Sequence, residues 1–259
     1  MGYNLLNDKF KDIRVRKALN LAVDKQEIIN IILLGQGRIS TGPFVPEMWS
    51  YNPDVEPAPF DPRKARSLLQ EAGWSDSDGD GILDKGGKLF EFTIVTNQGN
   101  DQRIKTAEII QKRLGEIGVR VKIKVVEWSV FLTRSIDKRD FEAIIMGWSL
   151  PREPDLYDIW HSSKSREGEF NFVGYANPEV DRLMTEARKI FDQQTRKSYY
   201  QRVHRLIYDD QPYMFLYVPD SLSVLHSRFR GIEPAPAGIG YNFIDWWVPK
   251  REQRYRITQ

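Results

Sequence analysis

Hydrophobic positions follow a helical period over the first quarter of the chain. Apolar residues three and four positions apart predict helices over about 12–22 and 24–32, and each begins at an aspartate that can cap it. Asp61-Pro62 predicts a third helix start, because an aspartate cap followed by proline is favoured there, and Gly73 predicts its end. The proline-rich stretch 35–59 has no clear period, so we expect a long loop there.

From residue 89 the pattern changes to the alternation of β-strands. Alternating or wholly apolar runs predict strands, and helical patterns separate them: strands at 90–96, 119–125 and 141–146, helices at 104–117 and 130–136. Strands and helices in this order, with short connections, predict parallel pairing with right-handed crossovers.

The last third of the chain is mainly helical. Two helical patterns lie at 180–191 and 199–207. The short apolar runs 214–218 and 222–225 predict a closing hairpin or edge strands. The chain is therefore expected to be α/β, with flanking helices around a parallel β-α-β-α-β unit.

Composition narrows the function classes. The 259 residues are 41% hydrophobic and 12% aromatic, enough for a core, which excludes a wholly disordered chain. Lys and Arg number 38 and Asp and Glu 36, and a net charge of +2 offers no broad field for nucleic acid or an anionic membrane. The absence of cysteine excludes disulfides, thiol nucleophiles, thiolate zinc sites and iron–sulfur clusters.

Neither a leader nor a membrane span is evident in the pattern. The first residues lack a basic region followed by an apolar core. The longest apolar run, 28–34, is interrupted by Asn30 and is far shorter than the roughly 20 residues that cross a bilayer. We therefore expect a soluble chain as written.

The carboxyl ends of the predicted parallel strands form the first candidate site. Ligands of open α/β sheets bind beyond these ends, which here are 96–100, 126–129 and 147–151. Asn97, Asn100, Trp128 and Trp148 fall there, and they suit stacking and hydrogen bonding to an elongated polar ligand. The alternative is that both tryptophans are core residues.

An acidic loop is the second candidate. The segment 76–84 matches D-x-D-x-D-G-I-x-D, the oxygen-rich start of a calcium loop, and the candidate ligands are Asp76, Asp78, Asp80, the Ile82 carbonyl and Asp84. Gly87 stands at the twelfth position in place of a bidentate glutamate, and a strand follows instead of a second helix. A solvated turn is the alternative, and a calcium-dependent interaction module is the function that this loop alone would suggest.

Catalytic motifs are weakly represented. The sequence contains no G-x-S-x-G, P-loop or G-x-G-x-x-G. Glu153 and Asp155 could act as acid and base in a carboxylate-dependent hydrolase, against the alternative of surface or capping carboxylates. No paired base stands at a recognisable spacing, so we expect no enzyme activity.

Several motifs, in order along the whole chain, resemble family 5 of the extracellular solute-binding proteins, the dipeptide-, oligopeptide- and nickel-type receptors of ABC importers. They are the D-x-R-V-R-x-A-L helix at 12–19, the Asp61-Pro62 helix through Trp74, the loop 76–84, Gly147-Trp148-Ser149 with Glu153-Pro154-Asp155, the segments 171–175 and 177–181, and 211–217. No single motif carries the resemblance; their order does.

The resemblance implies one lobe of a two-lobed, periplasmic-binding-protein-like (type II) fold with a mixed sheet. Family members are about twice as long, and the match begins at their second half, so the N-terminal lobe is expected to be missing. We divide the chain into 1–62 (helices and crossover loop on the inter-lobe side), 63–212 (the C-terminal α/β lobe) and 213–259 (a segment returning toward the missing lobe).

The resemblance also implies a ligand trapped between two lobes by hinge closure. Family pocket positions correspond to Trp128, Gly147, Trp148, Ser149 and Tyr217, with glycine and serine acting through backbone groups. Pro151 stands where peptide-binding relatives place an aspartate for the ligand's amino group, and Glu153 or Asp155 is a candidate substitute.

The ligand expected from the resemblance is a peptide or, alternatively, an oligosaccharide, and a metal chelate fits less well because only three histidines are present. The expected partners are an importer permease and the missing lobe, without nucleic acid. No cofactor is expected to be required beyond a structural calcium at the acidic loop. The parent protein is expected in the periplasm or tethered outside the membrane.

Overall fold

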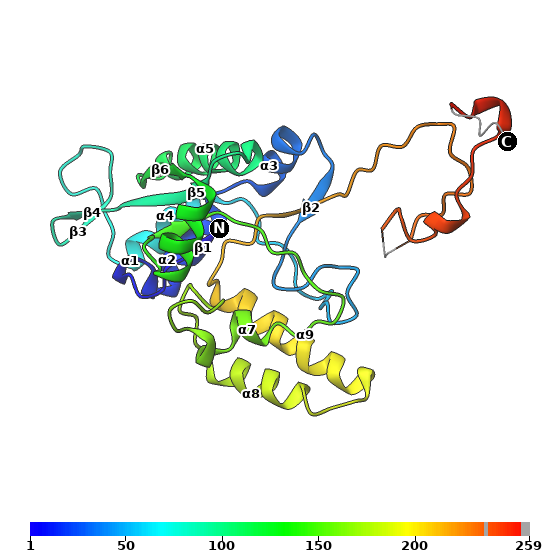
Figure 1. Cartoon of the computed structure of the whole chain (residues 1–259). Coiled ribbons are helices and arrows are strands. Elements are labelled where there is room, and N and C mark those ends of the chain that lie inside the picture. Colours follow the sequence, from blue (N-terminus) through cyan, green and yellow to red (C-terminus); the bar gives the residue numbers. More distant parts are fainter. Residues whose placement is uncertain (236–237, 255–259) are drawn as a thin grey trace. The chain divides into compact units, whose positions relative to one another are not determined.

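The computed structural model describes residues 1–235 and 238–254. The chain divides into two compact units, Met1–Pro219 and Asp220–Gln259. The sheet lies in the first unit (Figure 1). Both hydrophobic cores and the cavity described below also belong to this unit. The expected segments 1–62 and 63–212, together with residues 213–219 of the expected segment 213–259, all lie in that one unit. The end of the segment 213–259 lies outside the described residues.

A four-stranded sheet with the order β1-β7-β5-β6 lies at the centre of the first unit. β5 (Glu91–Asn97) and β6 (Arg120–Val126) pair in parallel over their full length. β7 (Ala143–Ile144) pairs in parallel with the other side of β5, and β1 (Gly2–Tyr3) pairs antiparallel with β7. The expected mixed sheet with a parallel unit is therefore confirmed.

Helices of the first half begin where side-chain caps were expected. α1 (Asp8–Lys11), α2 (Ile13–Leu21), α3 (Lys25–Ile32) and α4 (Pro62–Glu71) follow one another around the sheet. Asp12, Asp24 and Asp61 each accept hydrogen bonds from backbone N–H groups in the first turns of α2, α3 and α4. These caps satisfy donors that a helix start leaves unpaired, which explains why the three starts could be predicted.

The crossover helix α5 (Asp101–Gly115) joins β5 to β6. The Asn100 side chain caps it by accepting a hydrogen bond from the Arg103 N–H, and Gly118 turns the chain into β6 at a φ of +81°. After β6, α6 (Trp128–Val130) continues into a π-helix, Phe131–Asp137, where one short helix was expected.

The remaining helices of the unit follow β7. They are α7 (Tyr157–Trp160), a 3₁₀ turn (Ser162–Lys164), α8 (Pro178–Ala187) and α9 (Gln193–Asp210), and α8 and α9 lie side by side in Figure 1. α8 is shorter than its apolar pattern predicts. It ends at Ala187 because Asp192 already caps α9, and Phe191 in the connection is fully exposed.

Two hydrophobic cores cover the two faces of the sheet. Phe92 and Ile94 of β5 point into a core shared with α2, α4 and α5, in which Trp74 and Phe90 stack with ring centroids 4.4 Å apart. Val95 and Ile144 point into the other core, which α8 and α9 cover. The buried apolar side chains of β5 on both faces are typical of a parallel sheet between helical layers.

Two expectations about strands were wrong. β2 (Gly37–Ile39) lies within the expected loop and pairs antiparallel with β8 (Tyr217–Pro219). The hairpin of 214–218 with 222–225 does not form, since 222–225 is irregular and belongs to the second unit. Of the alternative, edge strands, residues 217–218 do lie in a strand, β8, whereas 222–225 do not. Strand 141–146 is reduced to β7, although the Ile145 N–H still donates to the Val95 carbonyl at 2.9 Å.

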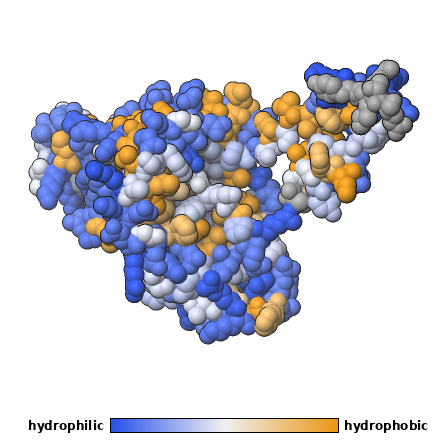
Figure 2. All heavy atoms as spheres, in the orientation of Figure 1, coloured by the Kyte–Doolittle hydropathy of each residue, from blue (hydrophilic) through white to orange (hydrophobic). Residues whose placement is uncertain are grey.

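The other short elements lie at the surface. β3 (Asp84–Lys85) and β4 (Lys88–Leu89) form a hairpin after the acidic loop. The second unit contains 3₁₀ turns at Phe243–Asp245 and Lys250–Glu252 and a bridge between Arg230 and Trp247. Hydrophobic residues are scattered over the visible faces in Figure 2. Among the described residues, no helix combines the length and the apolar character needed to cross a membrane.

Candidate functional site

A cavity of about 560 Å³ lies in the first unit at the carboxyl ends of the parallel strands. Its wall combines the start of α5, the segment 144–148 after β7, the loop 40–45, and the chain 213–219 that leads into β8. Four elements far apart in sequence therefore meet there because the parallel topology brings the strand ends to one edge. A volume of this size is in the range of small-molecule and peptide sites.

The structure brings some of the predicted site residues together and separates others. Asn100, Gly147, Trp148 and Tyr217 line the cavity. Asn97, Trp128 and Ser149 do not form its wall. Their roles in ligand binding stay predictions.

Asn97 does not line the cavity but contacts Arg103, which does. Its Oδ1 accepts a hydrogen bond from Arg103 Nη1 at 2.7 Å, and its Nδ2 donates to the Gln98 carbonyl at 2.8 Å. Asn97 is buried, so this amide holds the Arg103 guanidinium against the end of β5. Its position is thus that of a supporting residue in the present structure.

The two tryptophans are in different environments. Trp128 is 45% exposed and stacks on Phe131, with ring centroids 5.6 Å apart. Trp148 is half-buried and stacks on Phe172, with centroids 5.9 Å apart, while its remaining surface borders the cavity. Neither indole is sealed in the interior, in contrast to the buried Trp74 and Trp160.

Two buried polar atoms in the cavity wall lack hydrogen bonds of regular geometry. They are Trp148 Nε1 and the Tyr213 hydroxyl. Burial raises the pKa of the Tyr213 hydroxyl, and the nearby Trp148 indole acts in the opposite direction. Buried polar groups are normally paired, and the Trp148 indole acts on the Tyr213 hydroxyl as a side-chain hydrogen-bond partner.

Arg103 contributes a charged side chain to the wall of the cavity. Its Nη2 lies 3.5 Å from the position that a Cβ at residue 147 would occupy, so the guanidinium rests against Gly147. Burial lowers the pKa of Arg103, and Tyr217 acts in the opposite direction. Arg103 was not among the predicted site residues, because the predicted strand end 96–100 stops short of it. A cation in the first turn of a helix opposes the helix dipole, and this signal could have identified it.

The carboxylates considered for hydrolysis are paired with arginines. Glu153 lies 3.0 Å from Arg196 Nη1, and Asp155 accepts a hydrogen bond from Arg188 Nε at 2.8 Å. Neither carboxylate lines the cavity. Both carboxylates are engaged by arginines, and the substitution of either for the aspartate expected at position 151 stays a prediction.

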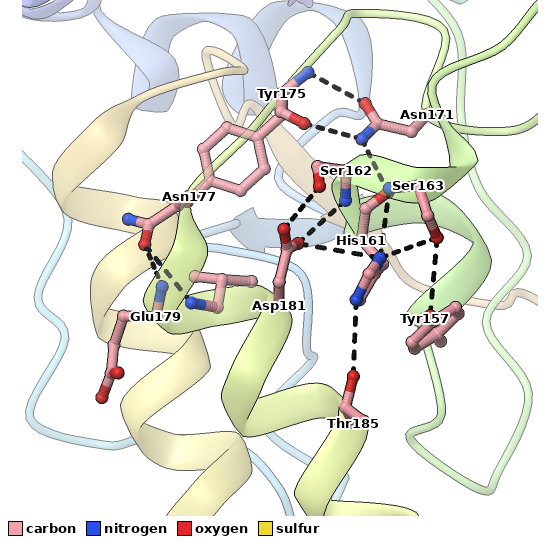
Figure 3. A network of polar contacts seen from close by, with 11 residues as sticks. Tyr157, His161, Ser162, Ser163, Asn171, Tyr175, Asn177, Glu179, Asp181 and Thr185 are labelled. Carbon is pink, nitrogen blue, oxygen red and sulfur yellow. Dashed lines mark hydrogen bonds and ion pairs between the residues drawn. The ribbon is translucent and has the colours of Figure 1, made fainter.

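A serine, a histidine and an aspartate do meet beside α8, as Figure 3 shows. Ser163 Oγ lies 2.8 Å from His161 Nδ1, and Asp181 Oδ1 lies 3.9 Å from the same nitrogen. In a hydrolytic triad the serine and the carboxylate form hydrogen bonds with opposite nitrogens of the histidine ring. Here the other nitrogen, Nε2, faces Thr185 Oγ1 at 3.4 Å. The geometry is therefore not that of a nucleophile activated by a base.

The same network has a structural role. Asp181 on α8 accepts hydrogen bonds from the Ser162 N–H at 2.8 Å and from Ser162 Oγ at 2.5 Å. The Asn171 amide donates to the His161 and Tyr175 carbonyls. These contacts, visible in Figure 3, fasten the loop 161–175 to α8.

The acidic loop brings three predicted ligands close together. Carboxylate oxygens of Asp76, Asp78 and Asp80 lie within 4.8 Å of one another, and all three side chains are exposed. Asp84 Oδ2 instead accepts hydrogen bonds from the Ser77 N–H and Oγ. The Asp76 carboxylate accepts from the Gly79 and Gly81 N–H groups, as in a hydrogen-bonded acidic turn. Calcium binding, including the role of the Ile82 carbonyl, stays a prediction.

The α/β fold places a cavity at the carboxyl ends of its parallel strands, which is where proteins with open α/β sheets bind their ligands. A family model, bacterial extracellular solute-binding proteins, family 5 Middle, matches residues 1–169. The chain belongs to family 5 of the bacterial extracellular solute-binding proteins. Family membership confirms the resemblance seen in the sequence, and because members are transport receptors, it also confirms that the chain is not an enzyme.

Individual relatives agree with this membership. The oligopeptide-binding protein AppA of Bacillus subtilis is 41% identical over 253 residues, which cover 96% of this chain and 46% of that protein. The dipeptide-binding protein of Escherichia coli is 28% identical over 242 residues, covering 92% of this chain and 43% of that protein. The chain therefore spans about half the length of the curated relatives it matches.

Solved structures confirm the fold. The structure of AppA in complex with a nonapeptide matches with a TM-score of 0.84 and 40% identity, covering 96% of this chain and 50% of that one. NikZ from Campylobacter jejuni in complex with Ni(L-His) matches with a TM-score of 0.82 and 29% identity, covering 95% and 50%. The expected periplasmic-binding-protein-like α/β fold is thus confirmed.

Proposed function

We propose that this chain is the substrate-binding C-terminal half of an ABC importer receptor, which captures a peptide between its α/β unit and a second half of the parent protein. The observation that carries the proposal is the cavity at the strand ends of a chain 41% identical to an oligopeptide-binding protein. The parent acts outside the cytoplasm, in the periplasm or tethered to the membrane, and delivers the peptide to a permease.

The cavity wall suits a peptide. Trp148, Phe172 and Tyr213 provide apolar surface for side chains of the ligand. Asn100, Tyr217 and the backbone at Gly147 and Ser149 add polar groups along the same edge. Trp128 and Asn97 lie outside this wall, and in the proposal they meet the ligand when the second half closes over it.

The division of the chain follows from the same proposal. Residues 63–212 form the C-terminal lobe, 1–62 carries the crossover connection, and 213–259 returns to the missing half. The second unit supports this assignment, because Leu222, Val224, Phe243 and Ile244 are mostly exposed in the present structure. Apolar side chains of this size are suited to burial against a partner surface.

Titration calorimetry tests the proposal with a defined nonapeptide and, for comparison, a linear hexasaccharide. We expect the full-length parent to bind the peptide and this chain to bind it at least roughly a hundredfold more weakly, because half of the contacts and the enclosure are lost. Preference of the parent for the hexasaccharide would favour the oligosaccharide alternative. Micromolar or tighter peptide binding by this chain alone would contradict capture between two lobes.

A further inference from the structure

Part of the cavity wall is a loop without regular secondary structure. The loop 40–52 contains neither helix nor strand, and its residues that line the cavity are Ser40, Gly42, Pro43 and Val45. The start of the loop is fixed, because the Ser40 N–H donates to the Leu216 carbonyl at 3.2 Å. The rest of the loop needs other support if this side of the wall is to keep one shape.

His204 supplies such support from α9. The ring is fully buried, its Nδ1 accepts the Asn52 N–H at 3.1 Å, and its Nε2 lies 3.3 Å from Thr41 Oγ1. Burial lowers the pKa of His204 to about 4, so the ring is neutral at pH 7. Because Nδ1 accepts a hydrogen bond, the neutral ring carries its proton on Nε2 and donates it to Thr41. One side chain thus binds both ends of the loop.

A neighbouring side chain of α9 holds only the far end. Gln201 Nε2 donates to the Tyr51 carbonyl at 2.9 Å, and Asn52 Nδ2 donates to the Gln201 carbonyl at 3.0 Å. His204 also reaches Thr41 and Gly42, which lie beside the cavity. The histidine therefore connects α9 to the wall itself.

Gly42 lies directly on the histidine ring. A Cβ at residue 42 would overlap Cδ2 and Nε2 of His204, far inside van der Waals contact. The ring cannot move aside easily, since Phe44 and Tyr51 also pack against it with centroids 5.9 and 5.0 Å away. The φ of Gly42 is not in the left-handed region, so it is the lack of space that excludes a side chain there.

We propose that His204 is a positioning residue for solute binding, whose ring sets how far the loop segment 40–45 stands from α9 and thereby the width of the cavity on that side. This inference rests on the proposed function and adds a residue that acts on the solute through the loop. A larger residue at position 42 would push the loop into the cavity, and a smaller one at position 204 would let it withdraw. Both changes should therefore weaken binding by a chain that is still folded.

Complementary size changes test the proposal by NMR titration of this chain with trialanine, up to about 100 mM so that weak binding is measured. We expect Gly42→Ala to weaken binding about fivefold in the unaltered background and to have almost no effect in His204→Ala, where its methyl group no longer meets a ring. Thr41→Val removes the hydrogen bond to Nε2 but keeps the ring, so it should weaken binding in the same direction. Gly115→Ala adds a methyl group that faces open space at the end of α5 and is the matched control.

Far-UV circular dichroism identifies the variants that fold, and Gly42→Ala and Thr41→Val decide the question if His204→Ala does not. Affinities equal to that of the unaltered chain, or the same loss for Gly42→Ala in both backgrounds, would overturn the role of His204 and leave solute binding intact. Faster hydrogen exchange of the Asn52 amide in His204→Ala with unchanged affinity would reduce the histidine to a purely structural role. Absence of trialanine binding by the unaltered chain would instead contradict the proposed function, and this inference with it.

Discussion

Arg16 is a buried cation whose hydrogen-bond acceptors are backbone carbonyls. It is 8% exposed, and its guanidinium donates to the carbonyls of Phe10, Lys11, Asp210 and Gln211. These carbonyls belong to the ends of α1 and α9, where a helix leaves acceptors unpaired. One residue in the D-x-R-V-R motif therefore joins the two ends of the first unit. The sequence pattern contained this residue, but only the structure shows why it is an arginine.

His204 is a second buried residue whose chemistry depends on its surroundings. It is fully buried on α9, Nδ1 accepts the Asn52 N–H at 3.1 Å, and Nε2 lies 3.3 Å from Thr41 Oγ1. Burial is the main cause that lowers its pKa from 6.5 to about 4, with a smaller contribution from Arg205. The imidazole is therefore neutral in the folded chain at pH 7 and fastens the loop 41–52.

Acidification should weaken the fold through His204. Because its pKa is lower in the folded than in the unfolded chain, the unfolded chain binds more protons between pH 6.5 and about 4. The stabilisation is complete above pH 6.5 and is lost as the pH falls toward 4. Urea unfolding at pH 6.5 and at pH 4 measures how much stability each protein loses between the two. We expect His204→Gln to lose about 2 kcal/mol less than the unaltered chain loses.

The control for this prediction is His226→Gln, which changes an exposed histidine of the second unit and should leave the pH dependence unaltered. An identical pH dependence for His204→Gln and the unaltered chain would show that His204 does not titrate across the unfolding transition. Comparing slopes rather than absolute stabilities removes the contributions of carboxylates that are common to all three proteins.

At the scale of elements, local signals decided which predictions succeeded. α2, α3 and α4 each combine an aspartate cap with an apolar stripe within one stretch of chain, and α5 carries an apolar stripe, so each was predicted. The pairing of β2 with β8 joins segments about 180 residues apart, and three-residue strands offer no period to detect. The predicted hairpin failed for the same reason, because 214–216 are buried by tertiary packing and 217–219 pair with a distant strand.

The start of α8 combines a cap with a tertiary contact. Asn177 Oδ1 accepts the Glu179 and Val180 N–H groups, and its Nδ2 donates to Asp210 Oδ2 at 2.7 Å. We expect Asn177→Ala to lower the free energy of unfolding by about 2 kcal/mol, since both the cap and the contact with α9 are lost. Asn177→Asp keeps a capping oxygen but places a second carboxylate beside Asp210. The decrease in the free energy of unfolding caused by this variant should therefore appear at neutral pH and become smaller in acid.

Urea unfolding at pH 7 and pH 4 measures both variants. Gln193→Ala, an exposed first residue of α9, is the control and should change stability by less than about 0.5 kcal/mol. A loss for Asn177→Asp that does not depend on pH would mean that charge repulsion with Asp210 is not its cause.

At the scale of the whole molecule, the sequence located the site but not all of its members. Asn100, Gly147, Trp148 and Tyr217 line one cavity, because the topological rule for parallel sheets and the family resemblance both point to the same edge. Arg103, Phe172 and Tyr213 also line it and were not predicted. Phe172 and Tyr213 reach the edge from loops whose course depends on packing against α8 and α9, which no local pattern encodes.

The boundary between the two units gives the last prediction. Both hydrophobic cores draw their described members from residues up to Tyr217, and β8 ends at Pro219. A chain truncated after Pro219 should therefore unfold in urea at the same midpoint as the full chain when the first unit's circular dichroism is followed. A truncation after Pro212 removes Met214, Phe215 and Leu216, which are all buried, together with the partner strand of β2. Losing three large core side chains costs more than about 5 kcal/mol, which is comparable to the whole stability of a domain, so the chain that ends at Pro212 should not fold. If the chain that ends at Pro219 instead unfolds at a much lower urea concentration than the full chain, residues beyond 219 stabilise the first unit. The assignment of those residues to the missing half would then be wrong.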